Sequence, residues 1–161
     1  MQKATRDLPS RIPPSALCLG IAGLIPFIAI PVLVAIGADV WMPDTLKGIA
    51  TIPALILYAA VILSFMGGVQ WGNAIRLSDA EPATDFRRYA ISVLPALLAW
   101  TATLLDARTG IAVLGVGFVV LLAYDIWTVR AGEMANWYET LRLGLTSVVV
   151  VSLTATSVLL I

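Results

Sequence analysis

Long uninterrupted apolar runs constrain this chain more than any other feature of its sequence. A helix of about 20 apolar residues crosses a hydrocarbon core of about 30 Å, and a helix satisfies its own backbone hydrogen bonds in lipid. Five runs meet this requirement, at residues 16–38, 49–72, 89–105, 110–129 and 141–161. The sequence therefore predicts an all-α fold class, a polytopic membrane helix bundle with five transmembrane helices that form a single domain over residues 1–161.

The composition also favours a chain embedded in lipid. Apolar residues make up 60% of the 161 residues and charged residues 12%, whereas soluble domains have about 45–50% and about 25%. Ten basic residues balance ten acidic ones, so the chain has no net positive charge that would attract nucleic acid. Nucleic acid is therefore not a predicted partner. The chain has no histidine and one cysteine, Cys18, which argues against imidazole catalysis and a cysteine-rich metal site. We predict no catalytic residue, no metal site and no cofactor.

The distribution of positive charge predicts the orientation of the chain. Eight of the ten lysines and arginines lie in the N-terminal tail and in the segments that follow the second and fourth spans. The other two, Lys47 and Arg108, lie in the opposite loops. Because positively charged loops stay in the cytoplasm, residues 1–15 are predicted to be a cytoplasmic tail and Ile161 to be periplasmic. The predicted location is the inner membrane of a bacterium.

Two other topologies stay open. Residues 89–105 are near the lower length limit for a span, and they could form a re-entrant hairpin with the next span. The basic tail and the apolar run after it could also be a signal peptide cleaved near Ala38, although Pro26 and Pro31 interrupt that run. The same two prolines predict that the first span is the most bent element of the bundle.

The second span carries small residues at every fourth position, namely Ser64, Gly68 and Gly72. This spacing places them on one stripe of the helix, where another helix can approach closely. We predict that the stripe packs against a neighbouring helix of the bundle. Association with a second chain and space for a ligand are the alternatives.

Polar and aromatic residues gather where the second and fourth spans end and the fifth begins. In a compact bundle these ends adjoin at the cytoplasmic rim. The predicted members of this polar cluster are Gln70, Trp71, Asn73, Arg76, Asp125, Trp137, Tyr138 and Arg142. An unpaired carboxylate in lipid is costly, so Asp125 is expected to pair with an arginine. The candidates are Arg76, Arg130 and Arg142.

The polar cluster has two interpretations. The first is anchoring at the membrane interface with a structural ion pair, and the second is a pocket for a lipid headgroup or small ligand. A catalytic site with Asp125 or Glu139 as its base is a further, weaker alternative, because the spacing shows no partner for either. Residues 133–140 are predicted to form a short helix that lies in the interface and places two aromatic rings on the headgroups.

Several motifs resemble those of the transmembrane protein 69 family, whose function is unknown. The central one is Ser64-Phe65-Met66-Gly67-Gly68-Val69-Gln70-Trp71-Gly72, preceded by Tyr58. Others are Leu19–Phe27 in the first span, Ser92–Pro95 with Trp100 in the third, and Asn136-Trp137-Tyr138 with Leu141-Arg142 at the start of the last. The resemblance extends from residue 19 to the fifth span and implies a small polytopic inner-membrane protein, without implying an activity, a cofactor or a catalytic residue.

The predicted function is that of a non-enzymatic accessory or assembly protein. Its predicted partners are membrane lipids and either a second copy of itself or another membrane complex. The alternative is a small transporter, or a lipid- or metabolite-binding protein with its site at the cytoplasmic rim. An enzyme acting on lipids is the weakest hypothesis, because Asp79, Glu81 and Asp85 bracket Pro82 in a predicted loop and look like solvated charges.

Overall fold

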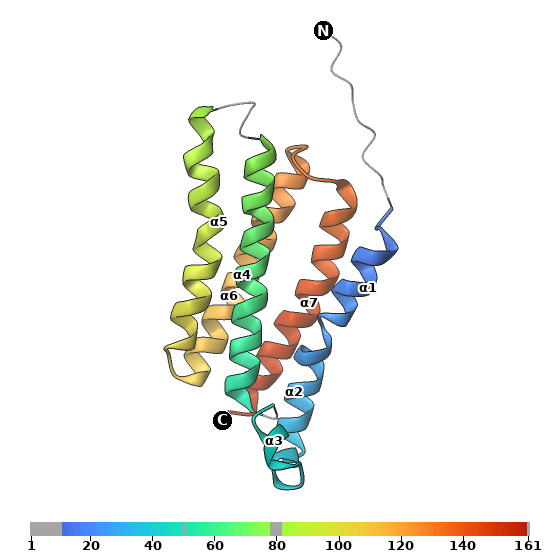
Figure 1. Ribbon diagram of the computed structural model, residues 1–161, viewed down its shortest axis with the longest axis vertical. Coiled ribbons are helices and arrows are strands. Elements are labelled where there is room, and N and C mark those ends of the chain that lie inside the picture. The colour runs from blue at the N-terminus through green and yellow to red at the C-terminus, as the bar shows by residue number, and fades with distance from the viewer. Residues whose placement is uncertain (1–10, 50, 78–81, 161) are drawn as a thin grey trace.

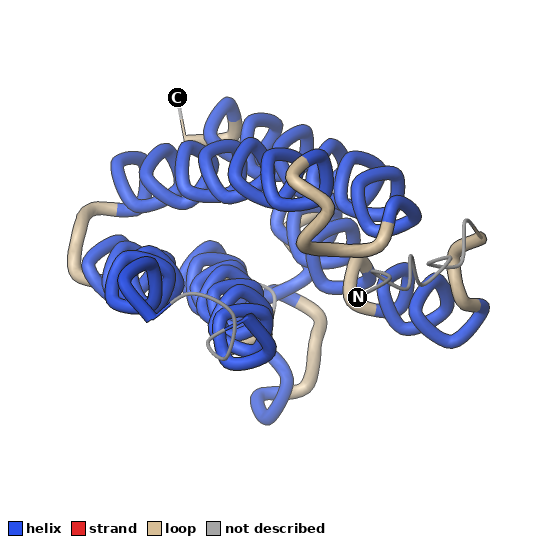
Figure 2. The backbone as a smooth tube through the Cα atoms, turned by 90° about the horizontal axis from the view of Figure 1, so that it is seen from above, coloured by secondary structure: helices blue, strands red, loops and turns tan. Residues whose placement is uncertain are grey.

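The computed structural model describes residues 11–49, 51–77 and 82–160, and every regular element in these ranges is a helix (Figures 1 and 2). The elements are α1 (Pro14–Ala22), α2 (Ile25–Ala35), the short 3-10 helix η1 (Ala38–Val40), α3 (Asp44–Lys47), α4 (Ile52–Leu77), α5 (Pro82–Thr103), α6 (Ala107–Arg130) and α7 (Asn136–Val158). The all-helical prediction is therefore confirmed. Most of the predicted tail, up to residue 10, lies outside the described residues.

The long helices run side by side along the long axis of the bundle (Figure 1). Among the described residues, four segments are long and apolar enough to cross a membrane: Pro14–Ala35, Ile52–Leu77, Ala107–Arg130 and Asn136–Val158. Helix α5 is not among them, so the prediction of five spans is not confirmed. Its uncharged part, Tyr89 to Thr103, extends about 22 Å at 1.5 Å per residue, which is less than a hydrocarbon core of about 30 Å.

The first predicted span is broken into α1 and α2 at Gly23 and Leu24. Pro26 lies in the first turn of α2 and lacks the N–H group that would have bonded to the carbonyl of Ala22. At the break, the Tyr58 hydroxyl of α4 donates a hydrogen bond of 2.9 Å to the carbonyl of Gly23. The bend predicted from the prolines is therefore present, and it lies just before Pro26.

The second proline of this segment, Pro31, lies inside α2. A proline leaves the carbonyl four residues earlier without its helical donor, and here that carbonyl belongs to Phe27. The Ser152 hydroxyl of α7 donates a hydrogen bond to it. This contact ties α2 to α7 at the position where the helix of α2 loses one of its own bonds.

Aromatic packing holds α2 in the bundle. Helix α2 contacts both α4 and α7, and the Phe27 ring centroid lies 5.2 Å from that of Tyr58 and 6.1 Å from that of Phe118. Phe27 and Phe118 are buried together with Leu63 and Leu114. We call this half of the bundle, around Phe27, Tyr58 and Phe118, the closed end.

Close contact between α4 and α5 depends on Gly67. A Cβ atom at this position would lie 2.6 Å from the carbonyl oxygen of Ser92 and 3.2 Å from Cβ of Pro95. Only glycine therefore fits without a shift of one helix. The opposite end of the bundle, where α4 and α6 end and α7 begins, is called the rim end.

Two predicted boundaries at the rim end are wrong. The predicted polar loop after the second span is largely helical, because α4 continues to Leu77 and α5 begins at Pro82. Pro82 occupies the first helical position, where a missing N–H costs nothing. The predicted separate helix at residues 133–140 is also absent, since α7 runs without interruption from Asn136 to Val158. Residues 78–81, which include Asp79 and Glu81, lie outside the described residues.

Candidate functional site

Three polar side chains from three helices meet inside the rim end. The Asp125 carboxylate of α6 accepts a hydrogen bond of 2.5 Å from Gln70 Nε2 of α4 and one of 2.6 Å from Arg142 Nε of α7. The exposed fractions are 0% for Asp125, 4% for Gln70 and 4% for Arg142. A buried charge is tolerated only when it is paired and hydrogen-bonded, and the fold meets this condition by opposing an arginine and an amide to the carboxylate.

Arg142 is therefore the partner of Asp125 among the three predicted candidates. Arg76 instead donates to Asn73 Oδ1 at 2.8 Å and to the backbone carbonyl of Glu133. Arg130 forms a more exposed ion pair of 3.0 Å with Glu139. These differences follow from position on the helices. Of the three arginines, Arg142 is the one that is buried, where α7 faces Asp125 of α6.

The turn between α6 and α7 completes this region. Gly132 has a positive φ of 74°, which glycine adopts without a steric penalty. The turn places the sulfur of Met134 at 3.8 Å from Gln70 Nε2 and 3.4 Å from Thr128 Oγ1. It also places the Glu133 carboxylate 2.7 Å from Arg88 of α5.

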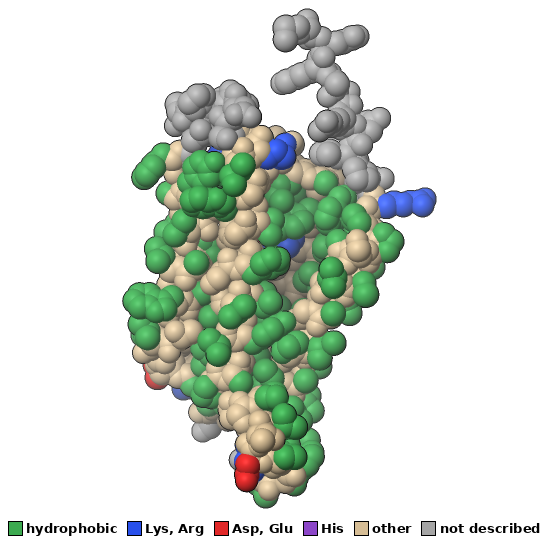
Figure 3. All heavy atoms as spheres, in the orientation of Figure 1, with side chains coloured by type: hydrophobic (Ala, Val, Ile, Leu, Met, Phe, Trp, Pro, Cys, Tyr) green, Lys and Arg blue, Asp and Glu red, His purple; other side chains and the backbone are tan. Residues whose placement is uncertain are grey.

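A surface groove opens beside this network. It has a volume of about 660 Å³. Its lining comes from the last turns of α4 and from the start of α7 with the turn before it: Val69, Gly72, Asn73, Arg76, Gly132, Glu133, Met134, Ala135, Trp137 and Tyr138. We call it the rim groove. Figure 3 shows a basic side chain recessed between apolar side chains on the face that α4 and α7 share.

The position of α1 leaves this side of the bundle less covered than the closed end. Helix α2 packs against α4 and α7, whereas the main contacts of α1 are with α7 (Figure 1). Near the rim end, α6 lies behind the space between α4 and α7, and no described helix covers that space from the other side as α2 does at the closed end (Figure 1). The rim groove is therefore open toward the surroundings of the bundle.

Four buried polar atoms in the described part of the chain have no hydrogen-bond partner, and three of them belong to α7. They are Tyr138 Oη, Arg142 Nη2 and Thr146 Oγ1, and the fourth is Arg88 Nη1. Buried polar groups are normally paired with protein or with water. The rim end therefore has more hydrogen-bonding capacity than its own side chains use.

The structure brings together seven of the eight predicted members of the polar cluster. Trp71 is the exception, because its ring packs against Tyr89 of α5 at a tilt of 58°, with the centroids 4.7 Å apart. It does not line the rim groove. Sequence reasoning overlooked Glu133, Met134 and Arg88, since no local pattern links a turn to a helix 45 positions away. It also overlooked Thr146, which its spacing of four residues from Arg142 could have indicated.

The predicted packing stripe lies on the surface of α4. A Cβ atom at Gly68 or Gly72 would meet nothing of the described chain within 4 Å, so the two glycines do not hold a neighbouring helix inside the fold. Ser64 donates its hydroxyl to the carbonyl of Ala60 in its own helix, at 2.8 Å. Gly67, one position away from the stripe, makes the close helix contact instead.

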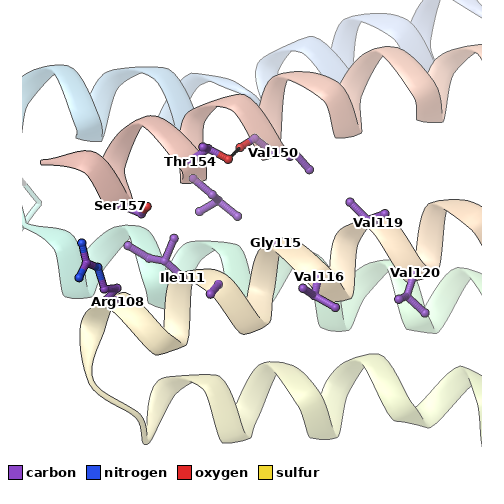
Figure 4. A pocket seen from close by; sticks show the side chains of 11 residues that line it. Arg108, Ile111, Gly115, Val116, Val119, Val120, Val150, Thr154 and Ser157 are labelled. Carbon is purple, nitrogen blue, oxygen red and sulfur yellow. Dashed lines mark hydrogen bonds between the residues drawn. The ribbon is translucent and has the colours of Figure 1, made fainter. Parts of the chain in front are cut away.

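Two other grooves differ from the rim groove in their chemistry. One, of about 420 Å³, runs between α6 and α7 past Gly115, Val116 and Val150 to Arg108 at its end (Figure 4). The other, of about 590 Å³, runs between α5 and α6 and is lined almost entirely by apolar side chains. The rim groove is lined by Met134, whose sulfur contacts Gln70 of the buried network, so the rim groove is the candidate site.

Known proteins share this sequence over nearly its whole length. Residues 12–158 match the family described as "Protein of unknown function (DUF3429)". The chain is 40% identical over 154 residues to Transmembrane protein 69 of Xenopus tropicalis, a match that covers 94% of this chain and 55% of that protein. It is 32% identical over 154 residues to Transmembrane protein 69 of Mus musculus, with 91% and 57% covered. No solved structure matches.

The chain thus spans about half the length of these two curated relatives. Their names and the apolar helices agree in describing a multi-pass membrane protein. The family resemblance predicted from the motifs is confirmed. The chain belongs to the DUF3429 family, the family of proteins similar to transmembrane protein 69.

Proposed function

We propose that this protein binds an amphiphilic molecule, a lipid or a metabolite with an apolar part, in the rim groove. One observation carries the proposal: the groove places Arg76, Trp137 and Tyr138 around an opening beside buried polar atoms that have no partner. Such a mixture of apolar walls and a few convergent polar groups is typical of ligand sites. Of the two functions predicted from the sequence, the geometry favours the binding protein over the accessory protein.

Gly72 contributes the space that this binding requires. It lines the rim groove, and a Cβ atom there would meet nothing of the described chain within 4 Å. A leucine at this position would therefore extend into the groove without forcing a helix to move. Gly68, one turn earlier on α4, is equally open but does not line the groove, and it provides a matched control.

The test compares lipids and small molecules that remain bound after purification in mild detergent. Native mass spectrometry of the wild type should show a bound amphiphile, Gly72→Leu should lose most of it, and Gly68→Leu should retain it. Wild-type protein without any bound amphiphile, or equal retention in the two leucine variants, would contradict the proposal.

Association with another membrane helix is the second candidate function. Gly68 is exposed on α4, and small residues on an exposed membrane helix let a second backbone approach closely. The same spectra test this function, because it predicts a dimer or a complex with another membrane protein that Gly68→Leu disrupts. A wild-type protein that is strictly monomeric in native membranes would contradict it.

The proposal includes an orientation in the membrane. We infer that α5 is the fifth crossing, because it lies along α4 at Gly67 and also contacts α6. The helix ends at the rim end carry most of the described arginines: Arg76, Arg87, Arg88, Arg130 and Arg142. This distribution supports a cytoplasmic rim end in a bacterial inner membrane. Reporter fusions at the two termini should report opposite compartments, and a common compartment would contradict the inference.

A further inference from the structure

The unpartnered atoms of α7 form a strip on one face of the helix. Tyr138, Arg142 and Thr146 follow one another at intervals of four residues, so their Cα atoms are about 6 Å apart along the helix axis. The strip begins at the rim groove, which Tyr138 lines, and leads toward the middle of the bundle. Arg142 and Thr146 are only 4% and 2% exposed and do not line the groove, so the strip meets the rim groove at Tyr138.

The chemistry of the strip favours an acceptor as its partner. A guanidinium nitrogen can only donate hydrogen bonds, and the tyrosine and threonine hydroxyls can donate as well. Asp125 already takes the Nε donor of Arg142, so Nη2 is available to a second acceptor. The oxygens of a phosphate or a carboxylate accept several hydrogen bonds at once, and such bonds are stronger than those between neutral groups.

Arg76 adds positive charge at the mouth of the groove. Its two hydrogen bonds go to neutral acceptors, Asn73 Oδ1 and the carbonyl of Glu133. The carboxylates of Glu133 and Asp125 are already paired with other arginines. Among the described residues Arg76 has no ion pair.

We propose that the rim groove binds the oxyanion headgroup of an anionic membrane lipid, with Arg76 at the mouth and Tyr138 as the inner donor. This assignment rests on the proposed function of the groove and names the class of its ligand. The groove opens toward the surroundings of the bundle, and Val69 and Trp137 give it apolar walls. A lipid fits both the donors and the apolar walls, because its phosphate accepts the hydrogen bonds and its chains remain in the bilayer.

Removing a single hydroxyl gives the sharpest test, because its effect has opposite signs with and without lipid. Without a ligand, Tyr138→Phe and Thr146→Val remove buried groups that have no partner, so the purified protein should unfold at the same or a higher temperature. With phosphatidic acid or phosphatidylglycerol added, Tyr138→Phe should bind about tenfold more weakly than the wild type, the loss expected for one hydrogen bond to a charged group.

Matched variants lie on faces away from the strip. Ser147→Ala removes an exposed hydroxyl on α7 that bonds to its own helix, and Tyr124→Phe removes a hydroxyl on α6 outside the rim groove. Neither should change lipid binding. Arg76→Gln should weaken binding of both anionic lipids while leaving binding of zwitterionic phosphatidylcholine unchanged.

The outcomes separate the ligand class from the function of the groove. Equal binding of phosphatidylcholine and phosphatidylglycerol, lost in Gly72→Leu, would keep the groove as a site and overturn the anionic headgroup. Stabilisation by inorganic phosphate alone, as strong as that by phosphatidic acid, would overturn the lipid and indicate a free anion. Anionic binding that is unchanged in both Tyr138→Phe and Arg76→Gln would overturn the assignment and leave the strip to internal water.

Discussion

The closed end and the rim end are built from the same three helices, α4, α6 and α7, yet they are completed in different ways. At the closed end, α2 fills the space between α4 and α7 with the Phe27 ring, which packs on Tyr58 and Phe118. At the rim end, α1 does not take the corresponding place, and the interior is held by the Asp125–Arg142 pair and Gln70.

This difference shows how one bundle can combine a closely packed half with a half that is open enough for the ligand we propose. Apolar side chains gain little from leaving lipid, so helices in a membrane associate through close packing and hydrogen bonds. The closed end uses packing, with buried aromatic rings that contact one another. The rim end uses hydrogen bonds, and it leaves some of them unmade.

The largest expected effect comes from breaking the buried pair of the rim end. Arg142→Leu leaves the Asp125 carboxylate buried without its partner, which typically costs about 3–5 kcal/mol. Thermal unfolding in detergent measures this loss. Arg130→Leu removes an exposed pair and should cost about 0–1 kcal/mol. Combining Arg142→Leu with Asp125→Leu should recover much of the stability; a double variant as unstable as the single one would contradict the role of the pair.

Adjacent glycines on α4 distinguish its packed side from its open side. Gly67→Ala pushes a Cβ atom against the Ser92 carbonyl and should destabilise the protein by about 1–3 kcal/mol. Gly68→Ala meets open space and should stabilise the helix by up to about 1 kcal/mol, since alanine favours helix more than glycine does. Equal unfolding temperatures for the two variants would show that α4 and α5 do not pack as described.

A smaller effect is expected where the closed end meets the break between α1 and α2. Tyr58→Phe removes the hydrogen bond to the Gly23 carbonyl and keeps the ring that packs on Phe27. Hydrogen bonds between membrane helices contribute about 0.6 kcal/mol on average and at most about 1.7 kcal/mol. The loss should appear as a modest fall in unfolding temperature and as faster labelling of Cys18 on α1. Unchanged labelling would mean that this bond does not position α1.

The smallest effect is a pH dependence at the start of α6. The hydrogen bonds that the Asp106 carboxylate accepts from Thr109 hold the pKa of Asp106 below its usual value. A group whose pKa is lower in the folded state stabilises the fold above its unfolded pKa of about 3.9. This contribution is lost as the pH falls through the folded pKa. Asp106→Ala should therefore unfold more easily than the wild type at pH 7, with the difference shrinking in strong acid. Asp106→Asn keeps a neutral capping side chain, so it should be more stable than Asp106→Ala by the same amount at both pH values.

The helical class and the buried pair were predictable because they depend on local sequence. Apolar runs of about 20 residues identify most of the helices. Burying the Asp125 carboxylate without a partner is energetically unfavourable, so an arginine near it was expected. The choice of Arg142 over Arg76 and Arg130 depends on the rotation of α7 against α6. No spacing within a single helix specifies that rotation.

Other features depended on contacts between distant segments and could not be predicted. The choice of Gly67 as the packing residue follows from where α5 lies, and the regular Ser64-Gly68-Gly72 spacing indicated the wrong face. Pro82 looked like a breaker in a loop, although the same residue is favourable at the start of a helix.

The central claim is that the rim groove binds an anionic lipid while the other grooves meet the lipids of the bilayer without selection. Photocrosslinking in vesicles of phosphatidylglycerol and phosphatidylcholine tests it most directly, with p-benzoylphenylalanine placed either at Trp137, an aromatic wall of the rim groove, or at Gly115 in the groove between α6 and α7. Crosslinks from position 137 should be enriched in phosphatidylglycerol relative to the vesicle, and those from position 115 should match its composition. The same lipid ratio at both positions would contradict the account.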